Sequence, residues 1–228
     1  MNDIYVINKN YEKIITGKYT FFLDTKLQKL VKRKLGRIKY NVYLPYIDSD
    51  KVIYYTDKIP NVLLYEIISK KKLKHQDILG TLFSLGIDPS MYGDILIIND
   101  HYYIYILDMI EKYFISNFYS INNSKIDLIK KDIDYLKDYR KQYESLELIV
   151  SSERVDTIIS NLIHCNRLKV NDKIKNKEIL VNYDIPKSSY NLKKGDIISV
   201  RKYGKYKYVG IVKYTKKNNY VVNLYKYI

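Results

Sequence analysis

Apolar residues recur with helical spacing at the start of the last third of the chain. Five of them follow the i, i+3, i+4, i+7, i+8 pattern of one buried helix stripe: Val155, Ile158, Ile159, Leu162 and Ile163. Ser152 precedes the stripe and is the expected N-cap, because its hydroxyl can accept from a free backbone amide. Arg154 lies off the stripe, so we expect its guanidinium to face solvent or a phosphate.

A second amphipathic helix is predicted directly after His164 and Cys165. Asn166 is its expected N-cap, and Val170 and Ile174 point inward. The opposite face carries polar and cationic side chains at i, i+3, i+7 and i+11: Asn166, Lys169, Lys173 and Lys177. A line of cations that leads away from a helix N-terminus is suited to follow a phosphate backbone. Strands are expected at 179–182 and 197–200.

The first 58 residues predict a small α/β piece. Asp24 is placed to cap a helix over residues 25–35, which ends at Gly36, and β-rich runs follow at 40–46 and 52–55. The helix is rich in lysine. It is either an auxiliary RNA contact or a solvated face, and the charge pattern favours the solvated face.

The middle of the chain alternates between strand and helix patterns in the order β-α-β-β-α-β. The expected elements are strands at 62–68, 95–98, 101–106 and 126–133, with helices at 75–86 and 107–118. This order is typical of a split-βαβ domain of the RRM or ferredoxin-like type. Tyr102, Tyr103 and Tyr105 are then candidates for base stacking on the sheet, although an ordinary antiparallel strand of this tyrosine-rich chain would look the same.

We therefore expect an α+β protein of three parts. These are an N-terminal α/β region (1–58), an RRM-like middle domain (59–147) and a C-terminal RNA-binding domain (148–228). A charged surface connection at 130–143 is expected to lead into the last part.

Charge supports a polyanionic ligand for the C-terminal part. Residues 151–228 hold 17 of the 40 Lys and Arg but 6 of the 25 Asp and Glu, which is +11 of the net charge of +15. Seven bases and no acid lie between Arg201 and Lys217, among Tyr203, Tyr206, Tyr208 and Tyr214. Cations and rings together can hold unpaired nucleotides, and the alternative is a basic hairpin without a specific ligand. Arginine is the more informative cation here, because lysine and tyrosine are abundant throughout the chain.

Composition also excludes several classes of protein. One cysteine, Cys165, rules out an internal disulfide, and with only three histidines a zinc site is not expected. The chain shows no signal-peptide pattern and no apolar run of membrane-spanning length. We expect a cytoplasmic monomer that needs neither metal nor cofactor.

Short motifs in the last third resemble the S4 RNA-binding domain. They are Ser152-x-Arg154-Val155-Asp156, Asn166-Arg167, Ile179-x-Val181-Asn182 and Gly195-Asp196-Ile197-Ile198-Ser199-Val200-Arg201. Further blocks are similar to the YlmH-type S4 proteins: His75-Gln76-Asp77-Ile78-Leu79-Gly80, Leu85-Gly86-Ile87, Gly93-Asp94-Ile95 and Phe22-Leu23-Asp24. Two departures are Lys177, where a glycine usually ends the second helix, and Lys202, which also replaces a glycine.

The resemblance implies a non-enzymatic protein that binds structured rRNA or tRNA on the large ribosomal subunit, in ribosome-associated quality control or translation. The residues that it places against RNA are Arg154, Asn166, Arg167, Lys169, Lys173, Asn182, Arg201, Lys202 and Lys205. One alternative is an RNA-modifying enzyme of the pseudouridine synthase or methyltransferase type with an appended S4 domain. Its candidate acid/base group is His75-Gln76-Asp77 together with Asp94. Another is a basic scaffold for acidic membranes or proteins.

Overall fold

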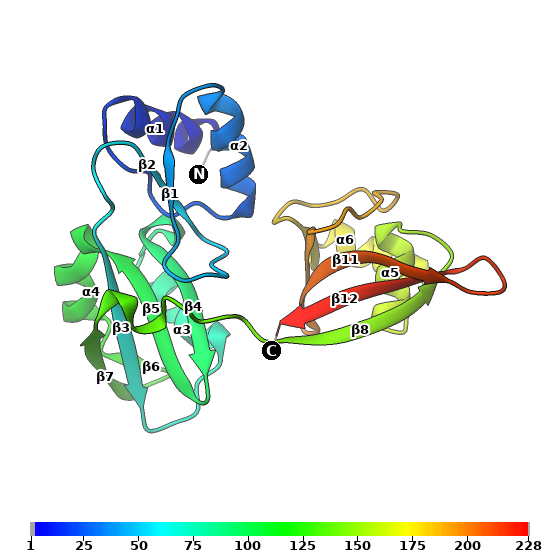
Figure 1. Cartoon of the computed structure of the whole chain (residues 1–228). Coiled ribbons are helices and arrows are strands. Elements are labelled where there is room, and N and C mark those ends of the chain that lie inside the picture. Colours follow the sequence, from blue (N-terminus) through cyan, green and yellow to red (C-terminus); the bar gives the residue numbers. More distant parts are fainter. Residues whose placement is uncertain (1–2, 228) are drawn as a thin grey trace. The chain divides into compact units, whose positions relative to one another are not determined.

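The computed structural model describes residues 3–227, which form two compact units that divide between Arg140 and Lys141. Both units mix helices and sheet (Figure 1), so the α+β class is confirmed. The helices within residues 3–227 are all too short or too polar to span a membrane.

The first unit begins with two helices that pack together, α1 (Asp3–Ile15) and α2 (Thr25–Leu35). Asp24 caps α2 as predicted, because its carboxylate accepts from the Leu27 amide at 2.8 Å. Gly36 ends the helix with φ of 58°, a conformation that glycine adopts without a steric penalty. A two-stranded antiparallel sheet follows, β1 (Asn41–Tyr43) and β2 (Ile53–Tyr55).

A five-stranded antiparallel sheet with the order β4-β5-β3-β7-β6 forms the body of this unit. Its strands are β3 (Val62–Ser69), β4 (Tyr92–Ile98), β5 (His101–Leu107), β6 (Ser120–Ile121) and β7 (Ser124–Lys131). The intervening helices are α3 (His75–Ser84), η1 (Pro89–Met91), η2 (Asp108–Ile110) and α4 (Glu111–Asn117), and η3 (Ile133–Leu136) follows the last strand. The helix expected at 107–118 is thus divided between η2 and α4.

One face of this sheet packs against α3 and α4. Ile78 and Leu82 of α3 and Phe114 of α4 are buried there, together with Ile67 and Ile104 of the central strands. The helices are held because their apolar stripes face the sheet.

The other face of the sheet is covered by segments from both ends of the unit. Phe22 and Tyr46 from the N-terminal region pack on Leu64 and Tyr105, and Ile133 of η3 joins them. The Tyr46 hydroxyl donates to Asp94 at 2.5 Å and thereby ties the N-terminal region to β4. Part of the predicted surface connection at 130–143 therefore packs against the sheet instead of crossing the surface.

This cover corrects the expectation that tyrosines of β5 lie exposed for base stacking. Tyr102, Tyr103 and Tyr105 are 3%, 5% and 0% exposed. Tyr102 faces the helices, where its hydroxyl accepts from the Leu73 amide at 2.9 Å, and the other two lie under the N-terminal segment. None of these three rings is accessible to a base.

The second unit is a five-stranded antiparallel sheet with two helices on one face (Figure 1). Its strands are β8 (Tyr143–Val150), β9 (Ile179–Val181), β10 (Ile197–Val200), β11 (Gly204–Tyr214) and β12 (Tyr220–Tyr227), in the order β8-β12-β11-β10-β9. The helices are α5 (Val155–Leu162) and α6 (Arg167–Lys175). Because β8 pairs with β12 along its whole length, the division between units falls before the expected boundary at residue 148.

Candidate nucleic-acid interface

The predicted RNA contacts are organised by α6. Asn166 caps this helix as expected, since its side-chain oxygen accepts from the Lys169 amide at 2.9 Å. Val170 and Ile174 are buried against the core, and Arg167 and Lys169 are exposed. Asn166 is therefore a structural cap, and any contact that it makes with RNA would be additional to that role.

Arg154 is not free for solvent, which corrects the sequence-based expectation. It occupies the N-cap of α5, where Ser152 was expected, and its guanidinium binds Asp156 with bonds of 3.0 and 2.6 Å. These hydrogen bonds, with a smaller contribution from the charge of Arg167, lower the pKa of the buried Asp156 carboxyl. Arg154 and Arg167 thus lie around one ionised carboxylate at the start of α6.

A second group of cations surrounds Glu178 just after the end of α6. Lys173 binds this carboxylate at 2.7 Å and lowers its pKa, and the charges of Arg201 and Lys202 lower it further. The Arg201 amide donates to the Glu178 carbonyl at 2.8 Å, so the β10–β11 turn is held beside α6. Lys177 adopts the left-handed conformation with φ of 58°, as a residue in place of a terminal glycine must.

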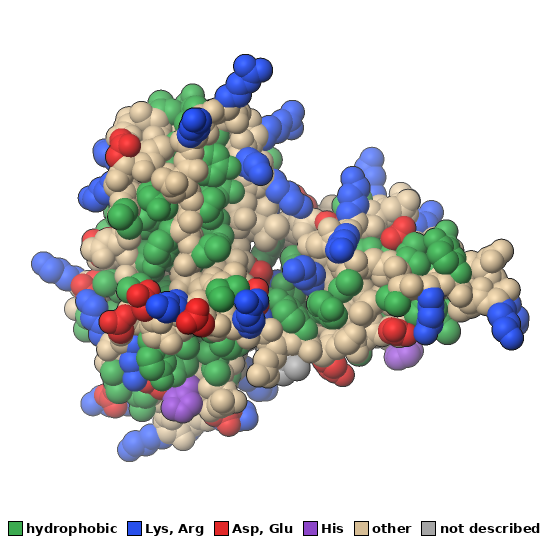
Figure 2. Space-filling model, in the orientation of Figure 1, with side chains coloured by type: hydrophobic (Ala, Val, Ile, Leu, Met, Phe, Trp, Pro, Cys, Tyr) green, Lys and Arg blue, Asp and Glu red, His purple; other side chains and the backbone are tan. Residues whose placement is uncertain are grey.

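Together with Lys169, the cations of these two groups lie on or beside α6, and we call them the α6 surface. Its members are Arg154, Arg167, Lys169, Lys173, Arg201 and Lys202. Arg154 and Lys173 are engaged by acids, and the other four cations are exposed. Figure 2 shows that Lys and Arg side chains also project elsewhere from both units. The α6 surface differs from these because the fold gathers its cations around one helix.

Asn182 and Lys205 lie outside this surface. Asn182 links β9 to β10, since its amide donates to Asp196 at 2.7 Å and its oxygen accepts from the Ile197 amide at 3.1 Å. Lys205 donates to the hydroxyl of Tyr183 at 3.2 Å, on the other face of the sheet. Asn182 therefore has a structural role, and Lys205 belongs to a different group of residues.

The tyrosines predicted to alternate with cations in β11 are mostly buried. Tyr206 and Tyr208 are 4% and 1% exposed, and both belong to the core beneath the helices. Tyr203 and Tyr214 are exposed, at the two ends of β11. Partly exposed rings also lie on β8 and β12, where no ring site was predicted from the sequence. The period-2 alternation of Tyr225 and Tyr227 in the last strand was the signal that could have revealed them.

The residues considered for catalysis have structural partners. Asp77 accepts from the Lys74 amide at 2.8 Å as part of a capping box. Asp94 accepts from Tyr46 and from the Asp50 amide at 2.8 Å. Within residues 3–227, no cluster of His, Cys, Asp and Glu is suited to hold a metal ion.

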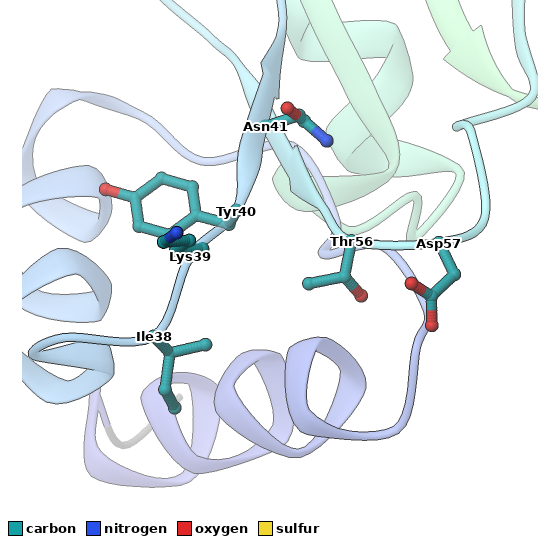
Figure 3. A pocket seen from close by; sticks show the side chains of 6 residues that line it. All are labelled: Ile38, Lys39, Tyr40, Asn41, Thr56 and Asp57. Atoms are coloured by element: carbon teal, nitrogen blue, oxygen red, sulfur yellow. The ribbon is translucent and has the colours of Figure 1, made fainter.

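Two shallow hollows in the first unit contain no group of side chains suited to catalysis. The larger is lined by Ile38, Lys39, Tyr40, Asn41, Thr56 and Asp57 (Figure 3). Its side chains come from the segment after α2, from β1 and from the two residues after β2, and it contains one carboxylate and one amine. The second contains Asp77 with amide and hydroxyl side chains.

A family model matches part of the first unit. Residues 61–135 match a family described as "Putative RNA-binding domain in YlmH". This segment runs from β3 into η3, and it does not include the α6 surface.

One relative extends the match beyond that segment. The chain is 24% identical over 149 residues to the ribosome-associated protein quality control protein P2 of Bacillus subtilis (strain 168), which covers 65% of this chain and 58% of the relative. The match therefore spans less than two thirds of the relative's length. A solved structure, the cell division protein ylmH from Streptococcus pneumoniae, aligns with a TM-score of 0.48 and 23% identity, over 60% of this chain and 96% of that chain. The family and relative matches confirm the predicted resemblance to the YlmH-type family.

Proposed function

We propose that this chain is a non-enzymatic RNA-binding protein that holds structured RNA on the α6 surface. The observation that carries the proposal is the gathering of six cations around one helix, four of them exposed. Such a surface neutralises phosphates in a fixed geometry and releases their counterions on binding. It supplies position and affinity rather than recognition of a base sequence.

In finer detail, we propose that the second unit is an S4-type domain. The support is the pairing of an amphipathic α5 with the capped, cationic α6 on one face of a small sheet, together with the S4-like motifs at Arg154, Arg167 and Asn182. For the first unit we propose a split-βαβ domain, supported by the antiparallel strand order β4-β5-β3-β7 with α3 and α4 on one face.

The matched segment 61–135 offers a second RNA contact within the first unit. Four exposed lysines lie in or beside the loop between β3 and α3: Lys70, Lys71, Lys72 and Lys74. Because the sheet faces of this unit are covered, we propose that its contact with RNA is made by this loop and not by aromatic rings of the sheet.

The proposed target is ribosomal RNA or tRNA on the large ribosomal subunit, in ribosome-associated quality control, with the protein acting as a monomer in the cytoplasm. Support comes from the relative in Bacillus subtilis, whose name describes a ribosome-associated quality control protein. A surface that reads phosphates and shape fits folded RNA better than it fits an acidic protein.

Co-sedimentation with purified ribosomal subunits tests the proposal. The full chain is expected to pellet with the large subunit in low salt and to be lost from it in the Arg167→Ala, Arg201→Ala double variant. The control variant Lys216→Ala, Lys217→Ala removes the same amount of charge from the β11–β12 turn, which lies at the other end of β11 from the β10–β11 turn (Figure 1). We expect this control to pellet with the large subunit as the wild-type chain does. Equal pelleting of the wild-type chain with both subunits would contradict the proposed target.

The proposal also includes the absence of catalysis. Its support is that Asp77 and Asp94, the candidate acid/base residues, accept hydrogen bonds that secure a helix start and a loop. Mass spectrometry of ribosomal RNA before and after incubation with the chain is expected to show no change in nucleoside mass. A new modified nucleoside would overturn this part of the proposal.

A further inference from the structure

The sheet of the second unit has a face that the helices do not cover. Leu224 of β12 is buried under α5 and α6, so its neighbours in the strand, Tyr225 and Tyr227, lie on the opposite face. Tyr143 of β8 pairs with Tyr227 in the register and joins them. All three rings are partly exposed.

These rings lie against one another across two strands. Tyr143 stacks on Tyr225 with ring centroids 5.5 Å apart, and it meets Tyr227 edge to face at 5.0 Å. Such contacts fix the rings in place, since offset and T-shaped pairs are the favourable aromatic geometries. A rigid group of rings loses little conformational entropy when a flat ligand binds to it.

Lysines flank the rings. The Lys205 amine lies 4.8 Å from the centroid of Tyr227 and 5.5 Å from that of Tyr183, and Lys141 lies 5.4 Å from Tyr227. Lys207 is exposed and directly opposite Tyr225 in the register. We call this group the tyrosine platform: Tyr143, Tyr183, Tyr225, Tyr227, Lys141, Lys205 and Lys207.

We propose that the tyrosine platform binds unpaired nucleotides of RNA, with bases stacked on the rings and phosphates on the lysines. The binding energies favour a base over a lysine as the partner of an exposed ring. A lysine on an exposed ring contributes about 0.5–1 kcal/mol of binding free energy, whereas a stacked base contributes about 1–3 kcal/mol. A base therefore displaces a lysine from a ring face, and the displaced amine remains within reach of the adjoining phosphate.

The size and charge of the platform fit a single strand. It extends across the sheet from β8 to the turn after β9, which is four strand spacings or about 19 Å. Glu147, an acid on the same face, is paired with Lys213 at 3.7 Å and lies farther along β8 than Tyr143. Rings interleaved with amines recognise a ligand with flat faces and regular negative charge, which an acidic peptide does not offer.

This inference rests on the proposed RNA binding but uses a second surface. The α6 surface lies on the helical side of the sheet and is suited to folded RNA, whereas the platform lies on the other side. A chain with both surfaces would hold a paired segment and an adjoining unpaired segment of one RNA.

Fluorescence anisotropy of the full chain with labelled RNA tests the platform. The probes are an oligouridylate of about twelve nucleotides, the corresponding abasic ribose-phosphate chain and a fully paired hairpin. The wild-type chain is expected to bind the oligouridylate at least about 10-fold more tightly than the abasic chain, because stacking requires bases. This comparison needs no variant, so it holds even if a substitution disturbs folding.

The variant arm replaces the stacked pair with Tyr143→Thr and Tyr225→Thr, which keep a high strand propensity. We expect about 10-fold weaker binding of oligouridylate and unchanged binding of the hairpin. The matched control, Tyr214→Thr with Tyr220→Thr, removes another ring pair of the same sheet, whose centroids lie 5.5 Å apart. We expect this control to leave the affinities for oligouridylate and for the hairpin unchanged.

Several results separate this proposal from the function proposed above. Equal binding of the abasic chain, displacement of oligouridylate by polyglutamate of equal charge, or oligouridylate binding by the variant at wild-type strength would each overturn the platform. Hairpin binding that depends on Arg167 and Arg201 would stand in those cases. If the wild-type chain binds neither RNA, both proposals fail.

Discussion

The salt dependence of RNA binding offers the sharpest test of the α6 surface. The perturbation is the double variant Arg167→Ala, Arg201→Ala in the full chain. These two residues lie at opposite ends of the surface, both are exposed, and neither belongs to the buried core. Their removal takes away phosphate contacts while the Arg154–Asp156 and Lys173–Glu178 pairs stay in place.

The magnitude follows from the four exposed cations of the surface. If each neutralises one phosphate of a paired RNA, the slope of log K against log salt is about −3.6, and the double variant reduces it to about −1.8. Between about 50 and 200 mM salt, the wild-type chain would then lose about 150-fold in affinity and the variant about 12-fold.

Anisotropy titrations of the labelled hairpin at four or more salt concentrations measure the two slopes. The control is Lys216→Ala with Lys217→Ala, which lowers the net charge by the same amount in the β11–β12 turn. We expect its slope to equal that of the wild-type chain. A double variant with the wild-type slope, or a control with an equally reduced slope, would refute the assignment of phosphate contacts to the α6 surface.

Three further predictions concern stability. Gly93→Ala is expected to destabilise the first unit by about 1–3 kcal/mol in urea unfolding, because a Cβ there would lie 3.0 Å from the Cβ of Tyr105. Gly80→Ala, on the exposed side of α3, has open space around the new Cβ and is expected to stabilise the unit by about 0.5–1 kcal/mol. Lys177→Gly should relieve the left-handed backbone and raise the unfolding midpoint; an unchanged or lower midpoint would contradict this. The lowered pKa of Asp156 contributes stability above about pH 3.9, its unfolded value, and this is lost as pH falls through the lower folded pKa. Unfolding of Asp156→Asn should therefore depend less on pH below about 4, and an identical pH profile would argue against that contribution.

The sequence predicts α6 well because the signals for this helix are local. Asn166 as a cap and the inward positions of Val170 and Ile174 depend on residues within one or two helical turns. The left-handed conformation of Lys177 likewise follows from its place just beyond a helix end.

Side-chain exposure was harder to predict, because it depends on contacts distant in sequence. Nothing in the pattern of β5 shows that Tyr105 is covered by Phe22 and Tyr46, which come from the N-terminal region. Similarly, the sequence does not show that the Arg154 guanidinium is paired with the buried carboxylate of Asp156 in α5.

The alternation of residues in β11 separates its tyrosines from its lysines. Lys205, Tyr206, Lys207 and Tyr208 alternate strictly, so tyrosines and lysines must lie on opposite faces. The predicted site, in which the cations and rings of this strand together hold unpaired nucleotides, requires them to share one face. The structure places Tyr206 and Tyr208 in the core, and Lys205 lies 4.8 Å from the ring centroid of Tyr227 in β12.

The covering of the first sheet on its second side limits how the chain can be divided for experiments. A fragment that starts at residue 59 would uncover Leu64, Tyr103, Tyr105 and Leu107, an apolar area on a flat sheet that favours aggregation. A fragment that starts at residue 148 would lack most of β8 and leave an unpaired edge along β12. Cleavage between Arg140 and Lys141 spares both sheets, and it is the division to use for producing either half by itself.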